Sequence, residues 1–187
     1  MRELSPLEQT RKWVERIVIK HNFCPFAHKP SRHERIRYVV SKASSEEALI
    51  NDLNHELILL RDADINQTET TLLIVPNCLQ DFHDYNLFLD IADALIQQFN
   101  LEGVIQVASF HPNYQFADLD ENDVRNYTNR SPHPMFHLIL EDSIEKARFS
   151  YPNVELIPER NMDFLLNAGL EQTKKELENC YHTQSND

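Results

Sequence analysis

Six consecutive residues, 70–75, are apolar or β-branched, and Pro76 closes the run. A run of this length predicts a β-strand, and because it lacks polar alternation we expect it to be central and covered on both faces. Amphipathic helices flank it in the sequence: after the capping residues Ser44, Ser45 and Asp81, apolar residues recur at helical spacing. These positions are Leu49, Leu53, Leu57 and Leu60 before the strand, and Phe82, Tyr85, Phe88, Leu89, Ala92, Leu95 and Ile96 after it.

Other segments complete an alternating pattern. Residues 36–40, 104–110 and 135–140 predict three further strands, and residues 154–157 are a candidate fifth strand. A capping box at Ser5 and Glu8 predicts an opening helix that ends near Asn22, and residues 158–167 and 170–178 predict two closing helices. Strands that alternate with helices are typical of β-α-β units. We therefore expect one α/β domain over residues 1–179, with a mostly parallel or mixed sheet of about four to five strands covered by helices, and a frayed tail over residues 180–187.

Glycine is scarce: only Gly103 and Gly169 occur. Phosphate loops and dinucleotide-binding turns need several glycines, because the backbone must approach the phosphates closely. We therefore expect no nucleotide cofactor bound through a P-loop or a Rossmann fold. The motifs H-E-x-x-H and G-x-S-x-G are also missing from the sequence, which removes the usual support for zincin proteases and for nucleophile-elbow hydrolases.

The chain is acidic, with 18 Lys and Arg against 30 Asp and Glu and a net charge of -12. This field repels nucleic-acid backbones and anionic membranes, and we expect neither as a partner. No apolar signal-peptide core follows Met1, and no run approaches the roughly 18 apolar residues of a membrane span, so we expect a cytoplasmic protein. Cys24, Cys78 and Cys180 lack C-x-x-C spacing, which argues against a disulfide framework or a thiolate zinc site.

The polar stretch 113–134 between two predicted strands is the most distinctive segment for function. Loops longer than roughly 12 to 15 residues are uncommon in compact domains, and those that occur are usually lids, binding loops or disordered. In parallel sheets, ligands bind beyond the carboxyl ends of the strands, and His111 lies at that end of its strand. We therefore expect the functional site beside this loop.

His111 and His137 border the loop, and strand alternation puts Glu141 on the face of His137. If their strands are neighbours, we expect the two imidazoles to approach each other across the mouth of the loop. With Glu141 they would hold a divalent metal, or the two histidines would act as a proton-transfer pair near neutral pH. The structural alternative is that His111 caps a turn through its ring and His137 is a core histidine with satisfied hydrogen bonds.

Arg130 is a candidate clamp for a small anionic molecule, because a guanidinium forms bidentate hydrogen bonds with carboxylates and phosphates. Asn129, Ser131 and Tyr114 would add contacts to this ligand. One structural alternative is that the short polar side chains of residues 126–132 form turns with the backbone. Another is that Arg130 pairs with a loop carboxylate and only staples the loop. The carboxylates available for this are Asp118, Asp120 and Asp123.

Cys24 lies in a tight turn between Phe23 and Phe26. It is a candidate nucleophile or metal ligand, and if it caps a short helix with Pro25 at the first position, the helix dipole would favour the thiolate. At the end of the preceding helix, the dipole would oppose the thiolate. The structural alternative is a small residue buried between two aromatic rings, which is common for free cysteine.

Several motifs occur together in one order. They are N-F-C-P-F-A at 22–27, E-T-T-L-L at 69–73, S-F-H-P at 109–112, T-N-R-S-P at 128–132 and I-P-E-R-N at 157–161. On these motifs, residues 13–169 resemble the bacterial and plant family known as domain of unknown function 1415 (DUF1415). The resemblance implies no particular reaction. It implies motif positions for Cys24, His111, Asn129, Arg130, Ser131, His137 and Glu141.

Two positions depart from the pattern of this family. His133 replaces a usual tyrosine, and Leu140 replaces an arginine that commonly precedes Glu141. The second departure weakens any scheme that needs an arginine beside Glu141.

Two hypotheses about function follow. The first is an enzyme acting on a small anionic metabolite, which Arg130, Asn129 and Ser131 would hold. His111 and His137 would then move protons or hold a metal, with Cys24 as a secondary candidate. The second is a non-catalytic protein-binding or regulatory module that docks a partner through the 113–134 loop. Its aromatic residues, of the kind that anchor interfaces, are Tyr114, Phe116 and Tyr127. A loop that packs down with no partner is the remaining alternative.

Overall fold

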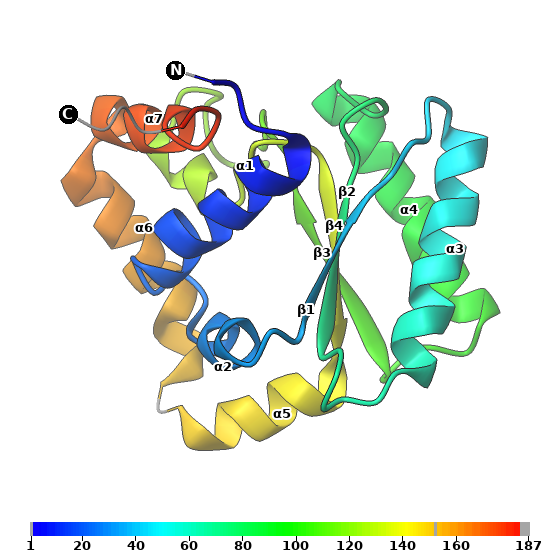
Figure 1. Cartoon of the computed structure of the whole chain (residues 1–187). Coiled ribbons are helices and arrows are strands. Elements are labelled where there is room, and N and C mark those ends of the chain that lie inside the picture. The colour runs from blue at the N-terminus through cyan, green and yellow to red at the C-terminus, as the bar shows by residue number, and fades with distance from the viewer. Residues whose placement is uncertain (1, 152, 184–187) are drawn as a thin grey trace.

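The computed structural model describes residues 2–151 and 153–183, and it shows an α/β fold with helices on both faces of a sheet (Figure 1). The helices are α1 Pro6–Trp13, the π-helix Val14–Ile19, α2 His28–Arg32, α3 Glu46–Asp62, α4 Phe82–Gln98, α5 Glu141–Ser150, α6 Ile157–Ala168 and α7 Leu170–Glu178. Short 3-10 helices are Pro25–Ala27, Val124–Thr128 and Val154–Leu156. The strands are β1 Ile36–Val40, β2 Thr70–Ile74, β3 Ile105–Phe110 and β4 Met135–Leu140.

The four strands form one mixed sheet in the order β1-β2-β4-β3. β1 and β2 are parallel, whereas β4 is antiparallel to both of its neighbours. The expected single α/β domain with a mostly parallel or mixed sheet of about four to five strands is confirmed, and the sheet is of the mixed kind because β4 runs between β2 and β3 in the opposite direction. β2 is central and every residue in it is buried, as its unbroken apolar pattern predicted.

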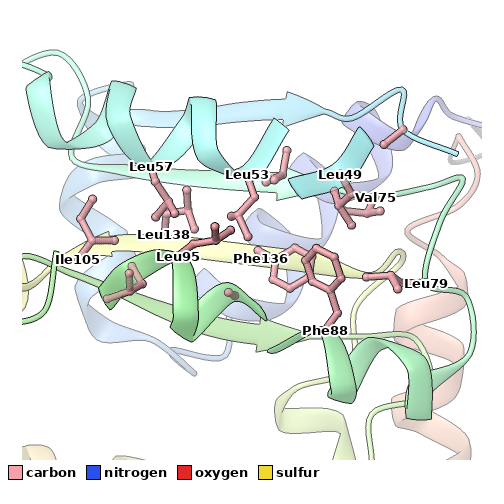
Figure 2. Packing of buried hydrophobic residues seen from close by; sticks show 14 of the residues in the cluster. Leu49, Leu53, Leu57, Val75, Leu79, Phe88, Leu95, Ile105, Phe136 and Leu138 are labelled. Atoms are coloured by element: carbon pink, nitrogen blue, oxygen red, sulfur yellow. The ribbon is translucent and has the colours of Figure 1, made fainter. Parts of the chain in front are cut away.

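One face of the sheet packs against α3 and α4 (Figure 1). Leu49, Leu53 and Leu57 of α3 are each 0% exposed, and they meet Phe136 and Leu138 of β4 in a closely packed layer (Figure 2). Because of the leucine spacing that predicted this helix, one continuous stripe of leucine side chains packs against the sheet. The opposite face packs against the other helices around a second cluster that includes Trp13, Ile74, Met135 and Leu165.

The helix boundaries follow from the residues at their ends. The Ser5 side chain accepts a hydrogen bond from the Glu8 amide, and the Glu8 carboxylate accepts one from the Ser5 amide, so the predicted capping box is confirmed. Asn22 has φ 56°, the left-handed conformation that ends a helix. Asp81 caps α4 by accepting hydrogen bonds from the amides of His83 and Asp84.

The predicted fifth strand is wrong. Residues 154–156 form a 3-10 helix, and Ile157 already begins α6. Asn153 has φ 56° and turns the chain, and Pro158 in the first turn favours a helix. This local start signal overrides the β-branched residues that suggested a strand.

The predicted frayed tail is also wrong for its first part. Cys180 is 1% exposed, the Leu4 amide donates to the Tyr181 carbonyl, and Glu3 forms an isolated bridge with His182. Residues 184–187 lie outside the described part of the chain. Across residues 2–151 and 153–183, no helix combines the length and apolar character needed to cross a membrane.

We expect the change Leu53→Ala to lower the free energy of unfolding by about 2 to 5 kcal/mol, because it leaves a cavity where α3 meets the sheet. Leu59→Ala is the matched control on the same helix, since Leu59 is 40% exposed and its loss should cost under about 0.5 kcal/mol. Urea unfolding followed by circular dichroism measures both. Equal losses in the two variants would contradict this packing.

Candidate functional site

A cavity of about 300 Å³ lies on the sheet face opposite α3 and α4. Every strand contributes to its floor, with Ile36, Leu72, Ala108 and Ile139 as one example from each. The roof comes from α1 and the π-helix, from the turn and short helices that follow, and from α5. The roof residues are Trp13, Val14, Val18, Cys24, Phe26, Ala27, Pro30, Ile144 and Ala147. Its volume is at the lower end of the roughly 300–1,000 Å³ typical of small-molecule sites.

His137 brings a titratable ring into this largely apolar cavity from the middle of β4. Its Nε2 lies 2.6 Å from the Thr70 hydroxyl, and that hydroxyl donates to the Leu138 carbonyl at 2.7 Å. A hydroxyl has only one proton to donate, so both contacts are satisfied when Nε2 of His137 carries the ring proton. Nδ1 then has a lone pair, and no described residue hydrogen-bonds to it.

Burial lowers the pKa of His137 to about 4, because the surroundings disfavour the charged imidazolium. The ring is therefore neutral near pH 7. In this state Nδ1 can accept a proton or a hydrogen bond from a molecule inside the cavity.

A second hollow of about 370 Å³ adjoins the cavity, and we call it the vestibule. The two share Phe26, Pro30, Glu69, Ser143 and Ala147 as lining residues. Lys29, Arg35 and Lys146 also line the vestibule, and Glu69 is the one acidic residue among the described residues that line it. In a chain with a net charge of -12, this is a locally cationic entrance.

Cys24 is half-buried and lines the apolar cavity. It stands at the N-terminal end of the 3-10 helix Pro25–Ala27, so of the two local arrangements open from the sequence, the structure has the one in which Cys24 precedes a new short helix. The amides of Phe26 and Ala27 lower the thiol pKa without forming a capping hydrogen bond, but burial dominates and raises it. The expected stabilisation of the thiolate by the short helix is therefore outweighed.

His111 is completely buried beside α4. Its Nε2 lies 3.1 Å from the Leu79 carbonyl, and its Nδ1 accepts from the Asn113 amide at 3.0 Å. The rings of Phe82 and Tyr85 lie 5.3 and 5.1 Å away between centroids. Backbone groups thus occupy both ring nitrogens, which matches the alternative in which His111 caps a turn. Burial lowers its pKa as well.

The expected approach of His111 to His137 is wrong. In the register of β3 and β4, Ala108 stands opposite His137 and Phe110 opposite Met135, so these four side chains share the cavity face. His111 follows Phe110 and packs among the α4 aromatics on the other face. Glu141 begins α5 beyond the end of β4. The described residues contain no group of three or more His, Cys, Asp or Glu side chains arranged to hold a metal, so the proposed His111, His137 and Glu141 set is not assembled.

The 113–134 loop is organised around two buried polar side chains. Asn126 accepts from the Phe116 amide and donates to the carbonyls of Asp120 and Glu121. Arg130 donates to the carbonyls of Tyr114 and Glu121, and its guanidinium lies 4.7 Å from the centre of the Tyr127 ring. Arg130 therefore stabilises the loop by hydrogen bonds to its backbone carbonyls.

The other candidate ligand-binding residues serve the same loop. Asn129 donates to the Ser109 carbonyl, Ser131 donates to the His133 carbonyl, and the Tyr114 ring packs on Phe82. The Ser131 contact matches the turn-forming alternative, whereas Asn129 ties the loop to the end of β3. The expected pairing of Arg130 with a loop carboxylate does not occur, because Asp123 binds Arg125 at 2.6 Å and no described contact joins Arg130 to Asp118 or Asp120.

The cavity does not lie at the end of the sheet where the sequence predicted the site. The cavity is lined at the beginnings of three strands, by Ile36, Thr70 and Gln106, whereas the 113–134 loop follows the end of β3. Trp13, Glu69 and Thr70 were missed as lining residues. One feature of the sequence could have indicated Glu69 and Thr70. They begin the motif E-T-T-L-L, in which polar side chains precede an otherwise apolar strand.

His137 makes a specific contribution to the pH dependence of stability. Its ordinary pKa of 6.5 applies in the unfolded chain, and about 4 applies in the folded chain. Between these values the unfolded chain binds the additional proton, so stability falls as the pH falls from 6.5 to 4, by at most about 3 kcal/mol. We expect the variant His137→Gln to lose this part of the dependence of the free energy of unfolding on pH.

The measurement is urea unfolding at several pH values, with the slope of the variant subtracted from that of the wild type. The subtraction is needed because burial also lowers the pKa values of His111 and His133. His83→Gln, a change at an exposed position on α4, is the control. Identical slopes for the wild type and His137→Gln would show that the His137 ring is not shielded in solution.

We expect Asn126→Ala to destabilise the protein by roughly 1 to 3 kcal/mol, because one buried amide and two carbonyls lose their partner. Asn122→Ala changes an exposed residue of the same loop and should have little effect. Thermal unfolding compares the two variants. Equal stability would mean that the loop does not depend on Asn126.

Comparison with known proteins identifies only the family of this chain. No curated protein matches the chain, and no solved structure matches it. Residues 5–175 match the family described as "Protein of unknown function (DUF1415)". The match spans nearly the entire chain and agrees with the resemblance noted on the motifs, so the chain belongs to the DUF1415 family.

Proposed function

We propose that this protein is an enzyme that acts on a small anionic metabolite with an apolar body, and that His137 accepts a proton from it. The observation that supports this most directly is the state of His137 in the cavity. Thr70 holds Nε2, and Nδ1 has no hydrogen-bond partner among the described residues. A neutral, oriented imidazole with one free lone pair is the arrangement required of a general base.

The lining of the two hollows supports the choice of ligand. The inner cavity offers mainly aliphatic and aromatic surface, such as Val18, Leu72 and Phe110, to the apolar part of the ligand. Lys29 and Arg35 line the adjoining vestibule, where an acidic group would find opposite charge. An anion that binds near His137 would raise the imidazole pKa from about 4 toward neutrality, because a nearby negative charge favours the imidazolium. Ligand binding would thus strengthen the base.

In this proposal Cys24 contributes a protonated thiol to the cavity wall, since burial raises its pKa. It is a secondary candidate for covalent chemistry, and its proton would have to be removed first. His111, Asn129, Arg130 and Ser131 direct the described hydrogen bonds of their side chains to backbone groups of the chain. We therefore assign these four residues to the scaffold and not to the ligand.

The test is incubation of the purified protein with a mixture of small carboxylates and phosphate esters, followed by NMR. We expect the wild type to convert at least one component. Because general-base catalysis typically contributes about 100- to 10,000-fold, His137→Gln should convert it at least about 100-fold more slowly. Trp13, the single tryptophan, lines the cavity, so its fluorescence reports whether a component binds.

His83→Gln is the matched control, because it removes an exposed histidine on α4 far from the cavity lining. Undiminished conversion by His137→Gln would contradict the assigned role of this residue. A change in Trp13 fluorescence without any conversion by the wild type would contradict catalysis and leave a binding protein.

A further inference from the structure

Two buried oxygen atoms at the border between cavity and vestibule have no hydrogen-bond partner among the described residues. They are Oε2 of Glu69, which directly precedes β2, and Oγ of Ser143, in the first turn of α5. Both residues line both hollows. Burying a polar atom without a partner is costly, so two such atoms beside one opening indicate a group that the ligand itself would supply.

The chemistry of these atoms restricts that group. A carboxylate oxygen only accepts hydrogen bonds, whereas a hydroxyl can accept or donate. The complementary ligand group must therefore donate to Glu69, as an ammonium or a hydroxyl does. The apolar lining farther inside contains no other carboxylate, so the donor is expected at this border.

Arg35 places a positive charge beside this acceptor. The Glu69 amide donates to the Arg35 carbonyl at 2.9 Å, which continues the parallel pairing of β1 with β2 and sets the two residues next to each other. Their charged groups are 3.7 Å apart between Nη1 and Oε2, which is too long for a hydrogen bond. The Arg35 side chain is 21% exposed and the Glu69 side chain 12%. A cation and an anion thus stand side by side at one opening, and the anion retains hydrogen-bonding capacity.

We infer that the ligand is a zwitterion of the hydrophobic α-amino acid class. Its ammonium donates to Glu69 and Ser143, its carboxylate meets Arg35, and its apolar side chain enters the inner cavity. This inference rests on the proposed function and narrows the anionic group to a carboxylate with an ammonium beside it.

The test compares three probes that share one apolar body: L-phenylalanine, 3-phenylpropanoate, which lacks the ammonium, and methyl 3-phenylpropanoate, which has neither a charge nor a hydrogen-bond donor. Binding is followed by Trp13 fluorescence in the full chain. We expect L-phenylalanine to bind at least about tenfold more tightly than 3-phenylpropanoate, since charge-assisted hydrogen bonds are among the strongest. Glu69→Gln should abolish this advantage while 3-phenylpropanoate binds as well or better.

Glu145→Gln is the matched control, because Glu145 is an exposed carboxylate on α5 that lines neither hollow. Ser143→Ala supplies a second variant in case Glu69→Gln fails to fold, and it should reduce the advantage of L-phenylalanine several-fold. Circular dichroism confirms that each variant is folded.

The outcomes separate this inference from the proposed function. If 3-phenylpropanoate binds more tightly than the methyl ester but L-phenylalanine has no advantage, the anionic ligand of the proposed function is retained and the zwitterion is overturned. If 3-phenylpropanoate binds no more tightly than the methyl ester and L-phenylalanine does not bind, both the zwitterion and the anionic ligand are overturned. An advantage of L-phenylalanine that persists in Glu69→Gln would overturn the role of Glu69.

Discussion

Strand β4 pairs with β2 on one side and β3 on the other, and its register determines the two faces of the molecule. Phe136 and Leu138 point toward α3 and α4 and complete a closely packed layer. His137, between them, points to the other face, where the roof leaves a cavity. A shift of one residue in this register would exchange these environments, burying an imidazole among leucines. The position of the candidate base thus depends on the antiparallel pairing of one strand.

The long loop after β3 illustrates that polar composition does not by itself indicate a binding site. Asn126 and Arg130 are almost fully buried, and they satisfy backbone groups that no helix or strand satisfies. The Trp13 indole donates to the Arg130 carbonyl, so the loop is also tied to the first helix. This loop uses its polar side chains as internal supports, because a long irregular segment must find partners for its backbone groups.

The cavity has mainly apolar walls, and its entrance is lined by charged side chains. Aliphatic and aromatic walls exclude water, so the few polar groups inside have stronger electrostatic effects than they would at the surface. Burial keeps His137 and Cys24 uncharged, and the charged residues Lys29, Arg35 and Glu69 stand at the entrance. A ligand with one apolar end and one charged end would match this division.

The sequence by itself determined the element types wherever a local signal was strong. The leucine stripe of α3, the unbroken apolar run of β2 and the caps at Ser5 and Asp81 all predicted what the structure shows. It also placed Cys24 and His137 among the candidates, and both line the cavity.

Only the tertiary structure decided the direction of β4, the separation of His111 from His137, and the placement of Glu69 and Ser143, from distant parts of the chain, in the lining of the same hollows. These features depend on which strands pair and in which direction, and that choice arises from burying both faces of the sheet at once. Local periodicity indicates which face of an element is apolar, but it contains no information about the neighbour that this face will meet.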